Sequence, residues 1–189
     1  MNIITSNFRY IVRLTLTLFI ITAIVALMLA GVNAVTVDRI AQLELEAKNA
    51  AMAEVMPDTT IDESKTIENE DSTVYYAMRE GELAGFCVEV APSGFGGEIS
   101  MIVGVDMGYK VTGISIISMS ETPGLGTRAQ EPDFLNQFVG RGDSAPFEVG
   151  SSGEGSIDAI SAATITSKAV TLGVNTALDA AADAINRGE

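Results

Sequence analysis

The sequence predicts an α+β protein, with a single N-terminal transmembrane helix followed by one extracytoplasmic domain that has an antiparallel sheet and flanking helices. Three observations predict this class. Residues 14–37 form an uncharged run rich in Leu, Ile, Val and Ala. Two pairs of β-type segments follow, each pair joined by a turn, and residues 165–186 show helical spacing of apolar side chains.

The uncharged run is expected to be a membrane anchor. Its 24 residues would span roughly 36 Å as a helix, against a bilayer core of ~30 Å. A cleaved signal peptide is the alternative, with Val32-Asn33-Ala34 as the cleavage site. The run is longer than the usual apolar region of such a peptide, about 7–15 residues, and this length favours retention.

The charges change sign along the chain. Of 189 residues, 25 are acidic and 11 basic, a net charge of −14. Residues 1–37 hold Arg9 and Arg13 and no acid, so residues 38–189 carry a net −16. The positive-inside rule therefore predicts a single-pass protein of the cell (inner) membrane, with residues 1–12 cytoplasmic and the acidic body extracytoplasmic. The acidic body also argues against nucleic-acid binding, because phosphate backbones repel it.

We expect a linking segment over residues 38–72 and a domain over 73–189. Apolar residues recur with helical spacing from Val37 to Met56, and Pro57 ends this helix. We expect it to continue the membrane helix or to pack on the domain as a stalk. The acidic segment Asp58–Asp71 has no periodicity and is expected to be a loop or a mobile link.

Four antiparallel strands are expected in the domain, because their β-type patterns are separated by short turns. The expected strands are Thr73–Met78, Leu83–Val90, Glu98–Val105 and Lys110–Ile117. A short helix over Pro132–Val139, a possible short strand over Phe147–Val149 and a final helix over Ile165–Asn186 are expected to follow.

The absence of histidine and the single cysteine exclude several kinds of site. Without histidine there is no His-ligated zinc, no Ser-His-Asp triad and no imidazole base. One cysteine, Cys87, excludes an internal disulfide, a CxxC pair and a Cys-ligated iron–sulfur cluster. Redox chemistry therefore requires a cofactor held in another way. Cys87 lies within a predicted strand and is expected to be a buried apolar residue.

Two clusters rich in glycine interrupt the predicted scaffold. Residues 92–97, Pro-Ser-Gly-Phe-Gly-Gly, lie between two strands, either as a hairpin loop or as a place where a ligand approaches the backbone. Residues 121–128, Glu-Thr-Pro-Gly-Leu-Gly-Thr-Arg, contain the Pro-Gly pair of a type II turn. Leu125, between two glycines, is unusual for a surface turn and is suited to contact an aromatic ring system.

A third cluster, residues 158–168, places hydroxyl groups at the start of the last helix. Ser161 or Thr164 can cap that helix. The same position also suits a phosphate, because free N–H groups and the helix dipole favour an anion there, and Lys168 adds a positive charge. The residues alone leave both interpretations open.

The three clusters, in this order, resemble signatures of the FMN-binding domain family, over roughly residues 73–187. Asp158-x-x-Ser161-x-Ala163-Thr164 is similar to the flavinylation motif. The resemblance implies that FMN is joined covalently to Thr164 through a phosphoester, with the other motif positions at Asp158, Ser161, Ala162 and Ala163. Ala162 departs from the family pattern, which has glycine there. If that position needs a positive φ, its methyl group costs about 1 kcal/mol, and a flavin transferase would accept the site less readily.

The resemblance also implies residues that surround the flavin without bonding to it. The Glu121–Gly126 run is similar to a signature that lies along the ring, and Gly94–Gly97 to a Gly-Tyr-Gly-Gly signature. The implied cofactor-binding residues are Glu121, Thr122, Gly124, Leu125, Gly126, Gly96, Gly97 and Lys168. No residue with a catalytic role of its own and no metal site are expected.

Members of this family include the G subunit of the Rnf complex and the C subunit of the sodium-pumping NADH:quinone reductase; the compact domain resembles the former more. The resemblance implies an electron-carrying membrane protein without independent turnover. It would act in an Rnf-type translocase that couples ferredoxin:NAD electron transfer to Na⁺ or H⁺ translocation. The implied partners are the other membrane proteins of the complex and a flavin transferase. A component of the sodium-pumping reductase and an unmodified extracytoplasmic ligand-binding or assembly module are the alternatives.

Overall fold

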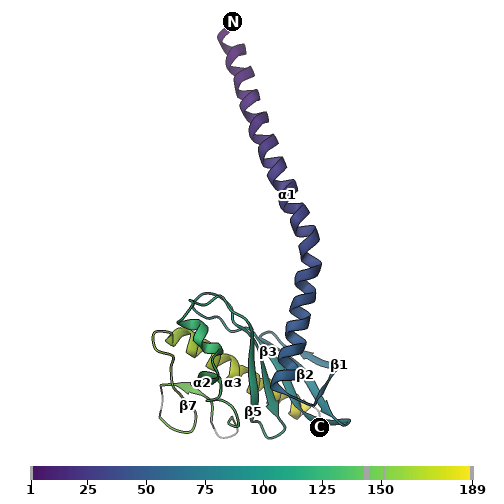
Figure 1. The fold of residues 1–189 in the computed structure, drawn as a ribbon, viewed down its shortest axis with the longest axis vertical. Coiled ribbons are helices and arrows are strands. Elements are labelled where there is room, and N and C mark those ends of the chain that lie inside the picture. The colour runs from purple at the N-terminus through teal and green to yellow at the C-terminus, as the bar shows by residue number, and fades with distance from the viewer. Residues whose placement is uncertain (1, 143–144, 151, 188–189) are drawn as a thin grey trace. The chain divides into compact units, whose positions relative to one another are not determined.

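The computed structural model describes residues 2–142, 145–150 and 152–187. The chain divides into two compact units, residues 1–46 and 47–189, and each is described by itself. Figure 1 shows the order of the elements. They are α1 (Asn2–Val55), β1 (Thr60–Glu68), β2 (Ser72–Arg79), β3 (Glu82–Val90), β4 (Ser100–Asp106), β5 (Val111–Ser118), the 3₁₀ helix η1 (Gly126–Gln130), α2 (Pro132–Leu135), β6 (Glu148–Val149), β7 (Ser156–Ile157) and α3 (Thr164–Arg187).

The described part of the first unit is the portion of α1 up to residue 46, which contains the expected membrane-spanning run. By length and composition the helix can cross a bilayer, with a mean hydropathy of 2.5 over its most apolar window, and none of that window is buried within the protein. Three of the hydroxyl groups in this stretch are satisfied locally. The hydroxyls of Thr17, Thr22 and Thr36 each donate a hydrogen bond to a backbone carbonyl one turn earlier, which removes the cost of placing a free hydroxyl in an apolar medium.

The second unit is built on a five-stranded antiparallel sheet in the order β1-β2-β3-β4-β5. Its register places Val74, Val88, Val103 and Ile114 in one row across four strands. These four side chains are buried in the main core. Because side chains alternate between the two faces of a sheet, the next row, Tyr75, Cys87, Gly104 and Gly113, belongs to the opposite face.

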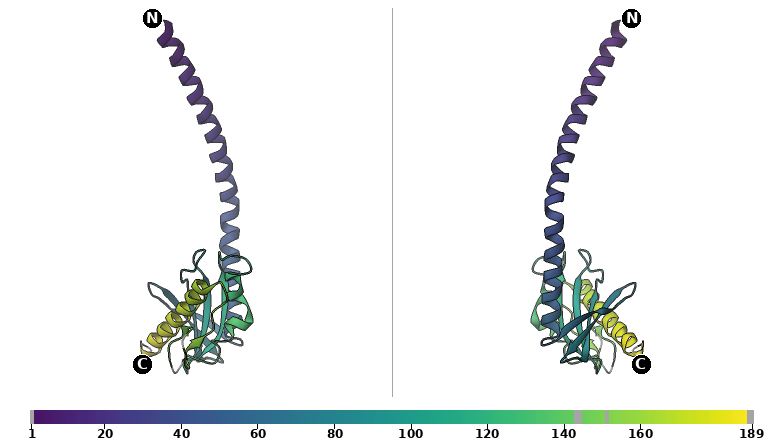
Figure 2. Two further views of the ribbon diagram at one scale, coloured as in Figure 1. Left: turned by 90° about the vertical axis from the view of Figure 1, so that its left-hand side faces the viewer. Right: turned by 90° about the vertical axis from the view of Figure 1, so that its right-hand side faces the viewer.

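Helix α3 covers the first face of the sheet and packs against β2, β3 and β4 (Figure 2). Its buried side is formed largely by small residues, among them Ala169, Ala177 and Ala181, and these allow the helix to approach the sheet closely. Gly173 is required at this contact, because a Cβ atom there would lie 2.8 Å from Cγ of Pro92.

The last turns of α1, within the second unit, cover the opposite face. Ala51, Met52, Val55 and Met56 pack with Ala77, Cys87 and Ile102 in a second buried cluster. Burial raises the pKa of the Cys87 thiol to about 12, in agreement with the apolar role expected for this residue.

Strand β1 corrects the sequence analysis, which expected a loop or mobile link over Asp58–Asp71. Thr60–Glu68 pairs with β2 at the edge of the sheet, and its register shifts between Asp62 and Ile67. An edge strand with polar side chains and an irregular register lacks the apolar alternation by which strands are recognised. The second unit therefore begins at Ala47 and contains the end of α1 together with the whole sheet.

The other elements agree with expectation, with small differences at their ends. The four predicted strands are present as β2 to β5, and the α+β class is confirmed. Helix α2 ends at Leu135 instead of Val139. The short strand β6 pairs in parallel with β7, which the sequence analysis did not predict. The division into an anchor (1–37), a link (38–72) and a flavin domain (73–189) stays a prediction.

Close packing of α1 on the sheet predicts the effect of Gly104→Ala. A Cβ atom at this position would lie 2.8 Å from the backbone oxygen of Val55 and 3.1 Å from its Cβ, and would also meet the Thr112 hydroxyl. We expect the variant to lose about 1–3 kcal/mol of stability, measured as a lower melting temperature by circular dichroism of the full chain in detergent. Gly108→Ala is the control, because only the Asp106 side chain lies within 4 Å of that Cβ. Equal melting temperatures for the two variants would contradict the packing argument.

Candidate cofactor-binding site

The three clusters singled out in the sequence meet at one cavity of about 410 Å³. Each cluster contributes residues from a different part of the chain: the loop between β3 and β4, the loop after β5, and the first turn of α3. The lining residues are Phe95, Glu121, Thr122, Leu125, Gly126, Ala162, Ala163, Thr164, Ile165 and Thr166.

The first cluster forms a tight loop between β3 and β4. The N–H of Gly94 donates to the carbonyl of Gly97 at 2.7 Å, and the N–H of Ile99 donates to Pro92 at 2.9 Å. These bonds agree with the hairpin interpretation. They place Phe95 at the tip of the loop, where its side chain is 69% exposed beside the cavity.

The second cluster forms the expected type II turn. Gly124 has a φ of 75°, and the N–H of Leu125 donates to the carbonyl of Thr122 at 3.1 Å. This is the geometry that Pro123 and Gly124 favour at the two central positions of such a turn. Leu125 follows the turn and leaves 41% of its side chain exposed at the cavity.

The third cluster brings Thr164 to the first position of α3. The turn before it is fixed by the N–H of Ala163, which donates to Ile160 at 2.9 Å, and by the Ser167 hydroxyl, which accepts from the N–H of Ile160 at 3.0 Å. Thr164 is exposed, and among the described residues its hydroxyl has no hydrogen-bond partner. The Ser161 hydroxyl likewise has no partner among the described residues, so neither hydroxyl makes the cap that was one of the two interpretations, and Thr164 presents a free oxygen at the cavity.

The backbone of Ala162 adopts a conformation that is strained for alanine. Its φ is 64°, in the left-handed region where a Cβ atom is strained and where glycine is preferred. The position therefore has the positive φ at which the methyl group of Ala162 was expected to be costly.

Glu121 is buried at the base of the cavity, with 7% of its surface exposed. One carboxylate oxygen accepts from the N–H groups of Phe95 at 2.8 Å and Gly96 at 3.0 Å, and the other accepts from the Thr166 hydroxyl at 2.7 Å. Burial by itself raises the pKa of this carboxyl, but the hydrogen bonds from Gly96, Thr166 and Phe95 outweigh it and hold the pKa below the ordinary 4.5.

Not every predicted site residue lines the cavity. Glu121, Thr122, Leu125, Gly126, Ala162, Ala163 and Thr164 do so. Gly96, Gly97 and Gly124 lie in the same loops without being part of the lining, and Asp158, Ser161 and Lys168 are exposed outside it.

The backbone of Asp158 is bonded to Gln137: the N–H of Asp158 donates to Oε1 of Gln137 at 2.7 Å. Phe95, Ile165 and Thr166 line the cavity but were not predicted as site residues. Phe95 was within reach of sequence reasoning, because it stands in the middle of a glycine run.

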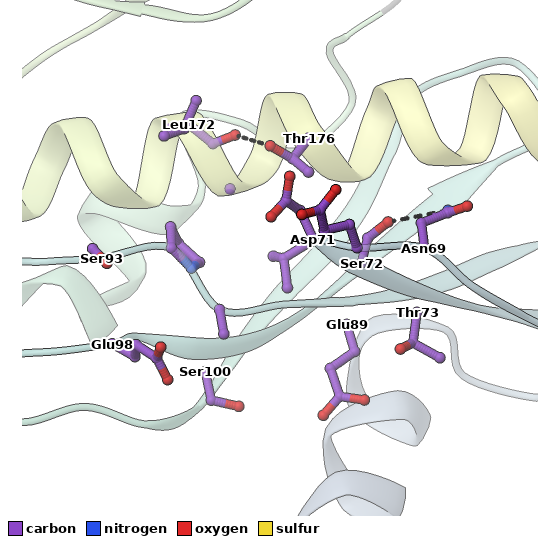
Figure 3. Close-up of a pocket in the computed structure, with 15 residues that line it drawn as sticks. Asn69, Asp71, Ser72, Thr73, Glu89, Ser93, Glu98, Ser100, Leu172 and Thr176 are labelled. Carbon is purple, nitrogen blue, oxygen red and sulfur yellow. Dashed lines mark hydrogen bonds between the residues drawn. The ribbon is translucent and has the colours of Figure 1, made fainter.

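A larger cavity of about 780 Å³ lies beside β2, β3 and α3 (Figure 3). Its lining includes the carboxylates of Glu70, Asp71, Glu89 and Glu98, and of these Glu89 is paired with Lys48 at 2.5 Å. Carboxylates repel a phosphate group. The smaller cavity, which holds the three clusters, is therefore the better candidate for a phosphorylated cofactor.

The strained alanine predicts that Ala162→Gly stabilises the protein. Glycine removes the left-handed strain, and we expect a gain of up to about 1 kcal/mol after its greater unfolded-state entropy is taken into account. The measurement is the melting temperature of the full chain in detergent. Ala163→Gly is the matched control. Ala163 is buried and has no positive φ, so its replacement should destabilise; a lower melting temperature for Ala162→Gly would contradict the strain argument.

The lowered pKa of Glu121 predicts a pH dependence of stability. Because the folded-state pKa lies below 4.5, the stabilisation by the ionised carboxylate is complete above pH 4.5 and is lost as the pH falls through the folded-state value. We expect the melting temperature of the wild type to exceed that of Glu121→Gln at neutral pH, and the difference to shrink as the pH is lowered below 4.5. A difference that stays constant down to the acid limit of the fold would contradict the assignment.

Comparison with known proteins finds an FMN-binding domain over the residues that line the smaller cavity. Residues 94–179, which include Gly94–Gly97 of the first cluster and all of the second and third, match the model of the FMN-binding domain family. The fold is similar to that of the C subunit of the Na⁺-translocating NADH-quinone reductase of Parabacteroides distasonis, with a TM-score of 0.55 and 18% identity over 77% of this chain and 94% of that chain.

The relatives that match most of this chain's length are named as G subunits of ion-translocating oxidoreductase complexes. The chain is 36% identical over 188 residues to the G subunit of the Na⁺-translocating ferredoxin:NAD⁺ oxidoreductase complex of Acetobacterium woodii, with 89% of this chain and 90% of that protein covered. It is 33% identical over 175 residues to the G subunit of the proton-translocating ferredoxin:NAD⁺ oxidoreductase complex of Clostridium ljungdahlii, with 92% and 91% covered. The convergence of the three motifs on one cavity and this identity along both chains show that the protein belongs to the family of G subunits of ion-translocating oxidoreductase complexes.

Proposed function

We propose that this chain is a membrane-anchored electron carrier, with FMN joined covalently to Thr164 through a phosphoester, and that it works within an Rnf-type complex. The observation that carries the proposal is the position of Thr164, whose free hydroxyl opens into the cavity formed by the three clusters.

The start of α3 is suited to the phosphate of FMN. The unpaired N–H groups and the dipole of a helix N-terminus favour an anion. The first turn of α3 contains no acidic residue of its own, and the nearby carboxylate of Glu121 is buried and accepts hydrogen bonds from Phe95, Gly96 and Thr166. Lys168, one turn after Thr164, adds a positive charge on the exposed side of the helix. Together these features suit a phosphoester at Thr164.

The rim of the cavity is suited to the ring of FMN. Phe95, Leu125 and Ile165 expose 69%, 41% and 55% of their surfaces around a cavity that also contains polar groups. Apolar side chains at the surface of a small cavity indicate a ligand with an apolar face. The flat isoalloxazine ring has such a face, and Leu125 and Thr122 are the residues that we expect beside it.

Bound FMN supplies one- and two-electron chemistry, while the protein supplies position and electrostatics. A relay of electrons between neighbouring proteins of a complex follows from this chemistry and from the relatives, which are named as components of ferredoxin:NAD⁺ oxidoreductase complexes. We propose the other membrane proteins of such a complex and a flavin transferase as partners. The charge split supports an extracytoplasmic flavin domain, and the coupling ion is Na⁺ or H⁺.

The alternative of an unmodified binding or assembly module is favoured by one observation, the positive φ of Ala162. A strained residue two positions before the attachment site raises the cost of holding the motif in this conformation. Covalent loading of the protein distinguishes this alternative from the electron carrier.

Covalent attachment predicts flavin fluorescence that survives denaturation. The full chain, produced in cells that make the flavin transferase, should give a fluorescent band on a denaturing gel, and Thr164→Val should abolish it. Thr176→Val is the matched control. Thr176 also lies in α3, but its exposed hydroxyl donates to Leu172 away from the cofactor cavity, so its loss should leave the band unchanged. A dark wild-type band, or a bright Thr164→Val band, would contradict the proposal.

A further inference from the structure

We propose that Glu121 is a positioning residue that sets the orientation of the flavin without binding it. Its carboxylate fixes the loop that carries Phe95 against the helix turn that carries Thr164. This inference rests on the proposed function and deepens it, because it states how the point of attachment and the ring-side loop are kept in register.

The hydrogen bonds of Glu121 join segments that are far apart in the chain. On one side, Oε1 accepts from the N–H groups of Phe95 and Gly96, which lie 26 and 25 residues earlier. On the other side, Oε2 accepts from the hydroxyl of Thr166, 45 residues later. Thr166 is itself 1% exposed and lies in the same helical turn as Thr164. A shift of either segment therefore has to break a bond to this carboxylate.

The neighbouring glycines make room for the carboxylate. A Cβ atom on Gly126 would lie 2.5 Å from Oε2 and 2.8 Å from Cβ of Glu121, and a Cβ atom on Gly94 would collide with Oε1. Two glycines in two different clusters thus face the same side chain. Their presence is explained by the approach of a protein carboxylate, in addition to any approach of a ligand.

The carboxylate has little capacity left for a cofactor. An ionised carboxylate offers about four acceptor positions, and three are taken by Phe95, Gly96 and Thr166. The side chain is also nearly closed to solvent, at 7% exposure. Glu121 therefore acts on a bound flavin through the Phe95 loop and the first turn of α3, and the variants below test this against a direct effect of its charge.

Two variants separate positioning from the effect of charge. Glu121→Gln keeps the shape and an acceptor oxygen for the two N–H groups, while its amide can donate to the Thr166 hydroxyl. Glu121→Ala removes all three bonds. Glu131→Gln is the control, since Glu131 is an exposed carboxylate paired with Arg128.

The first measurement needs no flavin. Hydrogen–deuterium exchange of the full chain in detergent, in a Thr164→Val background, reports the amides of Phe95 and Gly96. We expect Glu121→Ala to accelerate exchange at these amides several-fold, while Glu121→Gln and Glu131→Gln keep them protected. Unchanged exchange in Glu121→Ala would overturn the inference, whether or not the chain carries FMN.

The second measurement uses the flavin-loaded chain. Fluorescence anisotropy and iodide quenching, normalised to covalent loading by intact mass, report how firmly the ring is held. We expect lower anisotropy and several-fold stronger quenching in Glu121→Ala, with values close to wild type in Glu121→Gln. A Glu121→Gln protein that behaves like Glu121→Ala would show a role for the charge itself and overturn the inference.

A milder variant covers the case in which Glu121→Ala does not fold. Thr166→Val removes one bond at nearly constant shape, so a partial increase in quenching is expected, and an unchanged value would overturn the inference. A wild-type chain without flavin would contradict the proposed function alone, because the exchange measurement still tests the contact.

Discussion

One buried carboxylate joins two of the segments that form the proposed cofactor cavity. Glu121 lies between the β3–β4 loop and the start of α3, and its two oxygens accept hydrogen bonds from both. The first segment is rich in glycine and the second in hydroxyl residues, and each exposes an apolar side chain, Phe95 and Ile165. The five-stranded sheet brings the segments to the same end of the unit, and the carboxylate is bonded to both of them there.

The distribution of charge complements this arrangement. The body of the chain is strongly acidic, which is unfavourable for a cofactor that carries a phosphate. The carboxylates of Glu70, Asp71, Glu89 and Glu98 gather at the larger cavity, and the first turn of α3 has none. Glu121 is the acidic member of the smaller cavity's lining, and its charge is met by backbone N–H dipoles and a hydroxyl. The helix start therefore keeps its preference for an anion.

The parts of the structure that follow a local pattern could be predicted. Strands β2 to β5 are rich in β-branched and aromatic residues and are separated by short turns. The Pro123-Gly124 pair forms the turn typical of it, and the three clusters indicate one site. Strand β1 could not be predicted, because an edge strand needs no apolar face. The role of Glu121 was also hidden: its partners lie 25 to 45 residues away, and a lone glutamate in a turn gives no sign of burial. The strain at Ala162 depended on the backbone angle φ of that residue, which the structure supplies.

The burial of Cys87 has a consequence for an electron carrier. With its pKa raised to about 12, the thiol stays protonated near pH 7, and the thiolate is the form that attacks disulfides and oxidants. The sequence contains no other cysteine. Its sulfur is enclosed between the sheet and the last turns of α1, so electrons that reach this chain meet no competing thiol, and neighbouring chains cannot become cross-linked through it.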